Sequence, residues 1–237
     1  MEEKLIIFLH IPKTGGSTLN YIFRKHYSEK EIFDHVEIDK MIEQYNRLDD
    51  AERQTLKAIS GHHFYGIHEH FLKPCLYFTM LREPIDRVIS LYYFLREYPG
   101  YYQDNMKNMS LEEYIEWDPQ ARNGQTLQLC GSQNLANLQK AKENLETFPV
   151  FGITEKFNES LYLLKRNFGW SNIDYTKKNI TRVRPSLQEV PAKTIKKIEQ
   201  YNQLDIELYR FAEKKLTKQL EQLSKLDWEE IKKIKAT

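Results

Sequence analysis

The first residues along this chain that could do chemistry lie between an apolar run and an amphipathic segment. The run Leu5–Leu9 is apolar throughout, as in a buried strand, and apolar residues recur at helical spacing from Leu19 onward. Two glycines let the connecting turn approach a ligand closely, and the N–H groups of a helix start favour an anion. We therefore predict a phosphate-binding loop made of Pro12, Lys13, Thr14, Gly15, Gly16, Ser17 and Thr18.

A second candidate anion site follows another apolar run, residues 75–81, which we predict to be a buried parallel strand. Arg82 comes directly after this run. An arginine at the carboxyl end of such a strand faces the ligand crevice of an open α/β sheet, and its planar fork suits a phosphate. Ser90, on the helix predicted next, can donate to the same phosphate, whereas we expect Asp86 and Arg87 to form structural ion pairs.

Several histidines follow a short predicted strand that ends at Gly61. His62 comes directly after this glycine, so it can face a cleft and act as a general base near neutral pH. His63 beside it is a candidate for substrate binding, with a packing role as the alternative. His68 and His70 could chelate a metal, but no cysteine or acidic pattern completes a known site. We therefore predict no metal.

The order Pro-Lys-Thr-Gly-Gly-Ser-Thr at residues 12–18 resembles the 5′-phosphosulfate loop of sulfotransferases, which use 3′-phosphoadenylyl sulfate (PAPS). It is not a Walker A motif, because the lysine of that motif follows the second glycine. Arg82, followed eight residues later by Ser90, resembles the 3′-phosphate motif of the same enzymes. Together the two motifs resemble those of heparan-type 2-O and 6-O carbohydrate sulfotransferases and their bacterial relatives.

This resemblance implies roles for particular residues. It makes Lys13 a catalytic residue within the loop, and His62, in the Gly-His segment between the two motifs, the catalytic base. Asn123 and Gln125 match an Asn-x-Gln-Thr-x-x-Leu segment near the acceptor, although a capped surface helix is an equally good interpretation. In a later basic loop, Arg182 or Arg184 would meet the 3′-phosphate or the acceptor.

The resemblance also implies a fold and a reaction. We expect an α/β, P-loop-like three-layer fold, with a central, mainly parallel sheet, flanking helices and a helical C-terminus, as one domain over residues 1–237. The expected reaction is in-line transfer of a sulfuryl group from PAPS to an acceptor hydroxyl, with a histidine base and with PAP as the product. The acceptor would be a carbohydrate or a glycolipid.

Two other functions stay open. A nucleotide-dependent kinase or phosphotransferase would show an acidic Mg²⁺ ligand after a buried strand, but the run 75–81 is followed by Arg82 instead. The other alternative is a non-catalytic module that binds PAP or another nucleotide.

Bulk properties narrow the class of protein. The 237 residues are 41% hydrophobic and 29% charged, with a net charge of +1, which is typical of a soluble globular protein and does not indicate nucleic-acid binding. Cys75 and Cys130 form no disulfide or metal pattern. Neither a signal segment nor a membrane-spanning apolar run is found. We expect a cytoplasmic monomer or homodimer.

Overall fold

The computed structural model describes residues 4–34, 37–97, 101–176 and 184–235. Within these residues a five-stranded sheet has the order β2-β3-β1-β4-β5, and all neighbouring strands run parallel. The strands are β1 (Leu5–Leu9), β2 (Ile32–Asp34), β3 (Ala58–Gly61), β4 (Cys75–Leu81) and β5 (Gly152–Ile153). The two apolar runs predicted to be buried strands are confirmed as β1 and β4, which pair with each other in the middle of the sheet.

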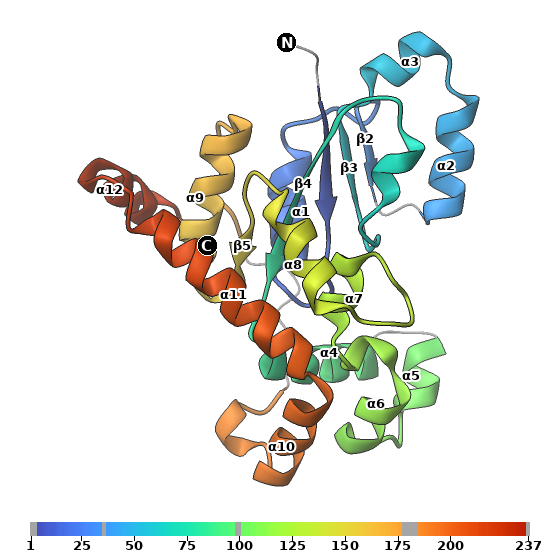
Figure 1. The fold of residues 1–237 in the computed structure, drawn as a ribbon, viewed down its shortest axis with the longest axis vertical. Helices are drawn as coiled ribbons and strands as arrows, with labels where there is room; N and C mark the ends of the chain where they lie inside the picture. Colours follow the sequence, from blue (N-terminus) through green and yellow to red (C-terminus); the bar gives the residue numbers. More distant parts are fainter. Residues whose placement is uncertain (1–3, 35–36, 98–100, 177–183, 236–237) are drawn as a thin grey trace.

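The α-helices of the described residues connect the strands and make up the predicted helical C-terminal region (Figure 1). They are α1 (Gly16–Arg24), α2 (Ile38–Arg47), α3 (Asp50–Thr55), α4 (Pro84–Glu97), α5 (Tyr101–Met106), α6 (Leu111–Trp117), α7 (Gly124–Cys130), α8 (Leu138–Glu146), α9 (Phe157–Phe168), α10 (Ala192–Tyr201), α11 (Gln203–Leu220) and α12 (Lys225–Lys233).

Both faces of the sheet are covered, because alternate residues of each strand point to opposite sides. On one face the Phe78 ring of β4 lies 5.2 Å from Phe23 of α1 and 5.3 Å from Phe168 of α9. On the other face the neighbouring Tyr77 ring lies 5.3 Å from Phe148, which follows α8. The predicted three-layer α/β fold is therefore confirmed.

A second apolar cluster lies beyond the carboxyl ends of the strands. It is built from α4, α5, α6 and α10, which stand together at that end of the sheet (Figure 1). Arg87 of α4 is fully buried and lies 3.8 Å from the equally buried Asp205 of α11. This confirms the predicted structural role of Arg87. That the chain forms one domain over residues 1–237 stays a prediction.

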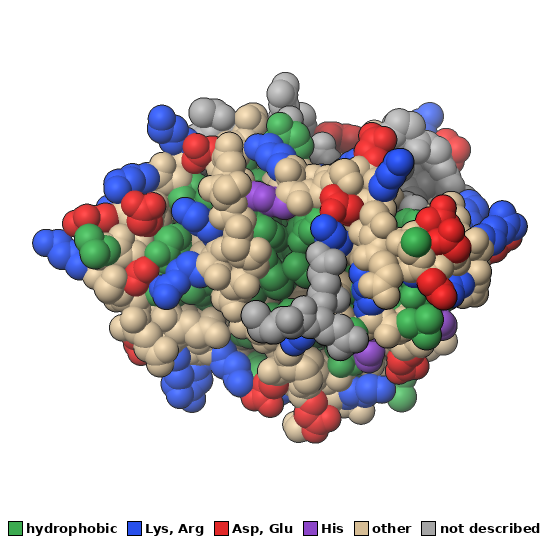
Figure 2. Space-filling view, turned by 90° about the horizontal axis from the view of Figure 1, so that it is seen from above, with side chains coloured by type: hydrophobic (Ala, Val, Ile, Leu, Met, Phe, Trp, Pro, Cys, Tyr) green, Lys and Arg blue, Asp and Glu red, His purple; other side chains and the backbone are tan. Residues whose placement is uncertain are grey.

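The surface carries both signs of charge. Figure 2, which views the molecule from above, shows acidic and basic side chains interspersed around a central group of apolar ones. This mixture agrees with the net charge of +1. Among the helices of the described residues, none is both long and apolar enough to cross a membrane.

Candidate functional site

The carboxyl ends of four neighbouring strands form the centre of the site. The residue directly after each strand lines a single cavity of about 410 Å³: His10 after β1, His62 after β3, Arg82 after β4 and Thr154 after β5. Open parallel sheets bind ligands beyond their carboxyl ends, at the point where strand order reverses. Here that point is β1, which lies between β3 and β4. The topology thus brings together side chains that are far apart in the sequence.

The predicted phosphate loop forms one wall of this cavity. It leads from β1 into α1, whose first intrahelical hydrogen bond runs from the Leu19 N–H to the Gly15 carbonyl at 3.2 Å. Gly15 has a φ of 80°, and Lys13 is a non-glycine residue with a φ of 69°. The N–H groups in the first turn of a helix have no intrahelical acceptor, and the helix dipole is positive there. The lining includes Pro12, Lys13, Gly15, Gly16, Ser17 and Thr18.

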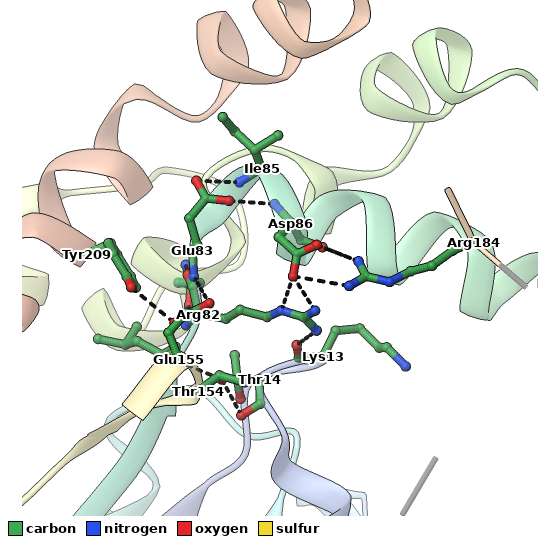
Figure 3. Close-up of polar contacts among 12 residues, drawn as sticks. Lys13, Thr14, Arg82, Glu83, Ile85, Asp86, Thr154, Glu155, Arg184 and Tyr209 are labelled. Carbon is green, nitrogen blue, oxygen red and sulfur yellow. Dashed lines mark hydrogen bonds and ion pairs between the residues drawn. The ribbon is translucent and has the colours of Figure 1, made fainter. Parts of the chain in front are cut away.

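Positive charge is concentrated in the cavity, because Lys13, Arg82 and Arg184 all line it (Figure 3). Arg82 Nη1 donates to the Lys13 carbonyl oxygen at 2.8 Å, which ties the end of β4 to the phosphate loop. The Lys13 ammonium lies 4.0 Å from the centre of the Phe94 ring. Burial, with the positive charges of Arg82 and Arg184, lowers the pKa of Lys13 to about 8. Such a site fits a ligand with several negative charges.

Ser90 reaches the same cavity from α4. Its side chain is buried, and it lines the cavity together with Arg82 and Arg184. The structure therefore brings residues of both predicted anion sites into one cavity. That these residues bind phosphate groups stays a prediction.

His62 is oriented by the neighbouring strand. Its Nδ1 lies 2.7 Å from the His10 carbonyl oxygen, and because a carbonyl only accepts, Nδ1 carries the proton in the neutral ring. Nε2 is then the ring nitrogen that can accept a proton. The His10 ring lies 4.3 Å from the His62 ring and stacks on Phe8 at 5.2 Å. The contact with the His10 carbonyl thus fixes the neutral tautomer of His62 at the cavity. That His62 acts as the base stays a prediction.

Comparison with known proteins decides the family. The model of the sulfotransferase family matches residues 1–212 of this chain. The chain belongs to the sulfotransferase family.

Its relatives include heparan-sulfate 6-O-sulfotransferase 2 of Gallus gallus, which is 26% identical and aligns with 89% of this chain and 66% of its own length. The Homo sapiens protein of the same name is also 26% identical, over 89% of this chain and 44% of its own length. The chain therefore spans less than two thirds of either relative. A crystal structure of mouse sulfotransferase SULT7A1 complexed with PAP is 18% identical and covers 73% of this chain and 60% of its own, with a TM-score of 0.43, which is too low for any argument.

In this sulfotransferase-family chain, Thr14 differs from its predicted role. Its side chain is fully buried and is not among the residues described as lining the cavity. The hydroxyl donates to the Ile11 carbonyl at 2.9 Å, while the Thr14 carbonyl accepts from the Thr154 hydroxyl at 2.8 Å. The Thr154 hydroxyl is also 2.9 Å from the carbonyl of Leu81. The Thr14 side chain therefore shapes the loop from inside the protein.

The prediction that Asn123 and Gln125 contact the acceptor is not supported by the structure. The side-chain oxygen of Gln125 accepts from the Arg82 N–H at 3.0 Å, and its amide nitrogen donates to the Arg82 carbonyl at 2.9 Å. The side-chain oxygen of Asn123 accepts from the N–H groups of Leu204 and Asp205 at 3.0 and 3.1 Å, at the start of α11. The Gln125 amide and the Asn123 side-chain oxygen are engaged inside the protein, so Gln125 positions the backbone of Arg82 and Asn123 caps a helix.

His63 is not among the residues described as lining the cavity either. It is buried, and a Cβ atom added to Gly61 would lie 2.5 Å from its Nε2. Its carbonyl accepts from Gln128 at 3.1 Å. These contacts favour the packing role over substrate binding. Arg182, the alternative to Arg184, lies outside the described residues.

Sequence reasoning missed several residues of the sulfotransferase-family site. His10 could have been found, because it follows a predicted buried strand directly, as Arg82 does. Aromatic side chains of α4, α9 and the segment after α9 had no comparable signal. The missed lining residues are His10, Leu91, Phe94, Thr154, Phe157 and Tyr175.

Proposed function

We propose that this chain transfers a sulfuryl group from PAPS to an acceptor hydroxyl, and that the acceptor is a carbohydrate, free or in a glycolipid. The observation that carries the proposal is one cavity that holds the phosphate loop, the Arg82 and Ser90 pair and the His62 ring. Family membership supports the reaction. The relatives are named as heparan-sulfate 6-O-sulfotransferases, which supports a carbohydrate acceptor.

The cavity fits PAPS by its size and its donors. At about 410 Å³ it lies within the range of small-molecule sites. Lys13, the start of α1 and the hydroxyl groups of Ser17 and Thr18 would hold the 5′-phosphosulfate. Arg82, Ser90 and Arg184 would hold the 3′-phosphate. PAPS supplies an activated sulfuryl group, and the product PAP keeps both phosphate positions.

The residues of this chain would act on protons and charge. The Nε2 atom of His62 would take the proton of the acceptor hydroxyl as its oxygen attacks sulfur in line. Negative charge would then grow on the phosphate oxygen that leaves, and the Lys13 ammonium and the helix start would stabilise that charge. Fixed donors of this kind carry much of the catalysis in group transfer.

A kinase function is disfavoured by the same cavity. Phosphoryl transfer from a nucleotide to an acceptor uses a carboxylate that holds Mg²⁺ after a buried strand. The described residues that follow β1, β3, β4 and β5 are histidine, histidine, arginine and threonine, and no acidic residue is among those described as lining the cavity. Asp34 at the end of the edge strand β2 pairs with Arg24 at 2.6 Å.

A transfer assay tests the proposal. PAPS labelled with ³⁵S would be incubated with an N-sulfated heparan oligosaccharide, a glycolipid and a simple alcohol, and calorimetry would compare PAP with ATP in Mg²⁺. We expect labelled carbohydrate and tight binding of PAP only. PAP binding without transfer to any acceptor would indicate a non-catalytic module, and ATP binding with phosphate transfer would indicate a kinase. Cytoplasmic location and oligomeric state stay predictions.

The Gly16→Ala variant tests the shape of the phosphate loop. A Cβ atom at this position would lie 1.9 Å from His10 Nε2, so either the loop or the ring must move. Overpacking of this kind costs about 1–3 kcal/mol, and we expect the affinity for PAP to fall about tenfold or more by calorimetry. In a His10→Ala background, where the ring is gone, the same change should cost less. Equal affinity in wild type and Gly16→Ala would contradict the geometry.

A further inference from the structure

The Asp86 carboxylate connects the two arginines of the cavity. Figure 3 shows Arg82 and Arg184 on different sides of it. The Arg82 Nε atom donates to the carboxylate at 2.9 Å, and Arg82 Nη2 donates to the same oxygen. Arg184 approaches with both terminal nitrogens, at 2.6 Å to Oδ1 and 3.3 Å to Oδ2. One carboxylate thus fixes two guanidinium groups from segments far apart in the sequence.

Asp86 contacts both arginines from outside the described cavity lining. Both guanidinium groups line the cavity, whereas Asp86 is not among the described lining residues. A guanidinium has five N–H groups, and those that do not face Asp86 or the Lys13 carbonyl remain for a ligand. The exposed fraction of the side chain is 14% for Arg82, 26% for Arg184 and 20% for Asp86. Water therefore screens the interactions among them only in part.

The carboxylate also offsets the repulsion between the two guanidinium groups. Two guanidinium groups beside the Lys13 ammonium repel each other, and the half-buried Asp86 supplies the opposite charge between them. Burial alone would raise the pKa of Asp86, but the ion pairs with Arg184 and Arg82 outweigh it, so the pKa lies below the ordinary value. Asp86 is therefore ionised at neutral pH, which is the state that holds both arginines.

We propose that Asp86 is a positioning residue that holds Arg82 and Arg184 as one preformed fork for the 3′-phosphate, and so sets the preference of this chain for nucleotides that carry that group. The proposal rests on the proposed function, because it takes the arginine side of the cavity as the 3′-phosphate site. It assigns to Asp86 more than the structural ion pair expected from the sequence. The carboxylate acts through the arginines and does not contact the nucleotide.

The test compares two nucleotides that differ in the 3′-phosphate. Calorimetry would give the affinities of PAP and 5′-AMP for wild type, Asp86→Asn and Asp86→Glu. In Asp86→Asn we expect the preference for PAP over 5′-AMP to fall at least tenfold, with 5′-AMP affinity changed less than PAP affinity. Asp86→Glu keeps the charge but moves the carboxylate by one methylene, so its loss should be smaller. Asp50→Asn removes the same charge at a 97% exposed side chain and serves as the control.

The outcomes separate this inference from the proposed function. A wild-type protein that binds PAP no better than 5′-AMP would refute the 3′-phosphate site itself. A wild-type preference that Asp86→Asn retains would refute the role of Asp86 alone. Tighter PAP binding in Asp86→Asn would also refute it, since the carboxylate would then act by repelling phosphate. Should Asp86→Asn not fold, Asp86→Glu decides, and an unchanged preference in that variant overturns the proposal.

Discussion

Replacing His62 with alanine is expected to lower kcat by about 10²–10⁴-fold, which is the usual contribution of a general base. The affinity for PAP should stay within about twofold, because His62 contacts the His10 carbonyl and the residues predicted to bind the phosphate groups are other residues of the cavity. Turnover would be measured with ³⁵S-labelled PAPS and an acceptor identified in the transfer assay. PAP binding would be measured by calorimetry.

The matched control is His70→Ala, which makes the same change at an exposed position outside the described cavity lining. It should leave both kcat and PAP affinity at wild-type values. Added imidazole should restore part of the activity of His62→Ala, because the missing group is then supplied from solution. Near-normal turnover in His62→Ala would show that the base is another group, and His10, whose ring lies 4.3 Å away, would be the next to replace.

Local sequence pattern was enough for the parts of the site that lie at strand ends. An apolar run followed by a polar residue predicts a strand and places the polar residue at the carboxyl end of that strand. This pattern located His62 and Arg82. The phosphate loop was equally local, because its glycines and the helix start are contiguous. His10 obeys the same rule, because it follows Leu9 directly at the end of β1.

Residue type alone did not predict the hydrogen-bond or ion-pair partner of a polar side chain. An amide after a turn suits an acceptor hydroxyl, but Gln125 hydrogen-bonds to the backbone of Arg82, on a strand end more than forty residues earlier. Thr14 lies in the loop, yet its hydroxyl turns inward to Ile11. The sequence predicts an ion pair for Asp86 but not its partners, which are Arg82 and Arg184. Such pairings depend on tertiary packing, which periodicity does not encode.

Replacing Lys13 with alanine is expected to lower kcat by about 10²–10³-fold, the usual cost of losing one donor to a developing negative charge. Its ammonium lines the cavity over the Phe94 ring, near Arg82 and Arg184, and belongs to the loop that would hold the 5′-phosphosulfate. The measurement is the single-turnover rate with labelled PAPS, which separates transfer from release of PAP. Wild-type rates in Lys13→Ala would exclude a catalytic role for this residue.

The charge of Lys13 also predicts how PAP binding depends on pH. Burial and the two neighbouring arginines lower the pKa of Lys13 to about 8, so the ligand-free protein loses this charge as the pH rises through that value. Bound phosphate favours the ammonium form and raises the pKa again, so binding takes up a proton above pH 8. PAP affinity should therefore be constant between pH 7 and 7.5 and should fall by up to about tenfold for each pH unit above 8.

The control is Lys13→Arg, which keeps its charge throughout this pH range. The PAP affinity of this variant should therefore not change with pH. An equally flat profile in the wild-type protein would contradict the lowered pKa of Lys13.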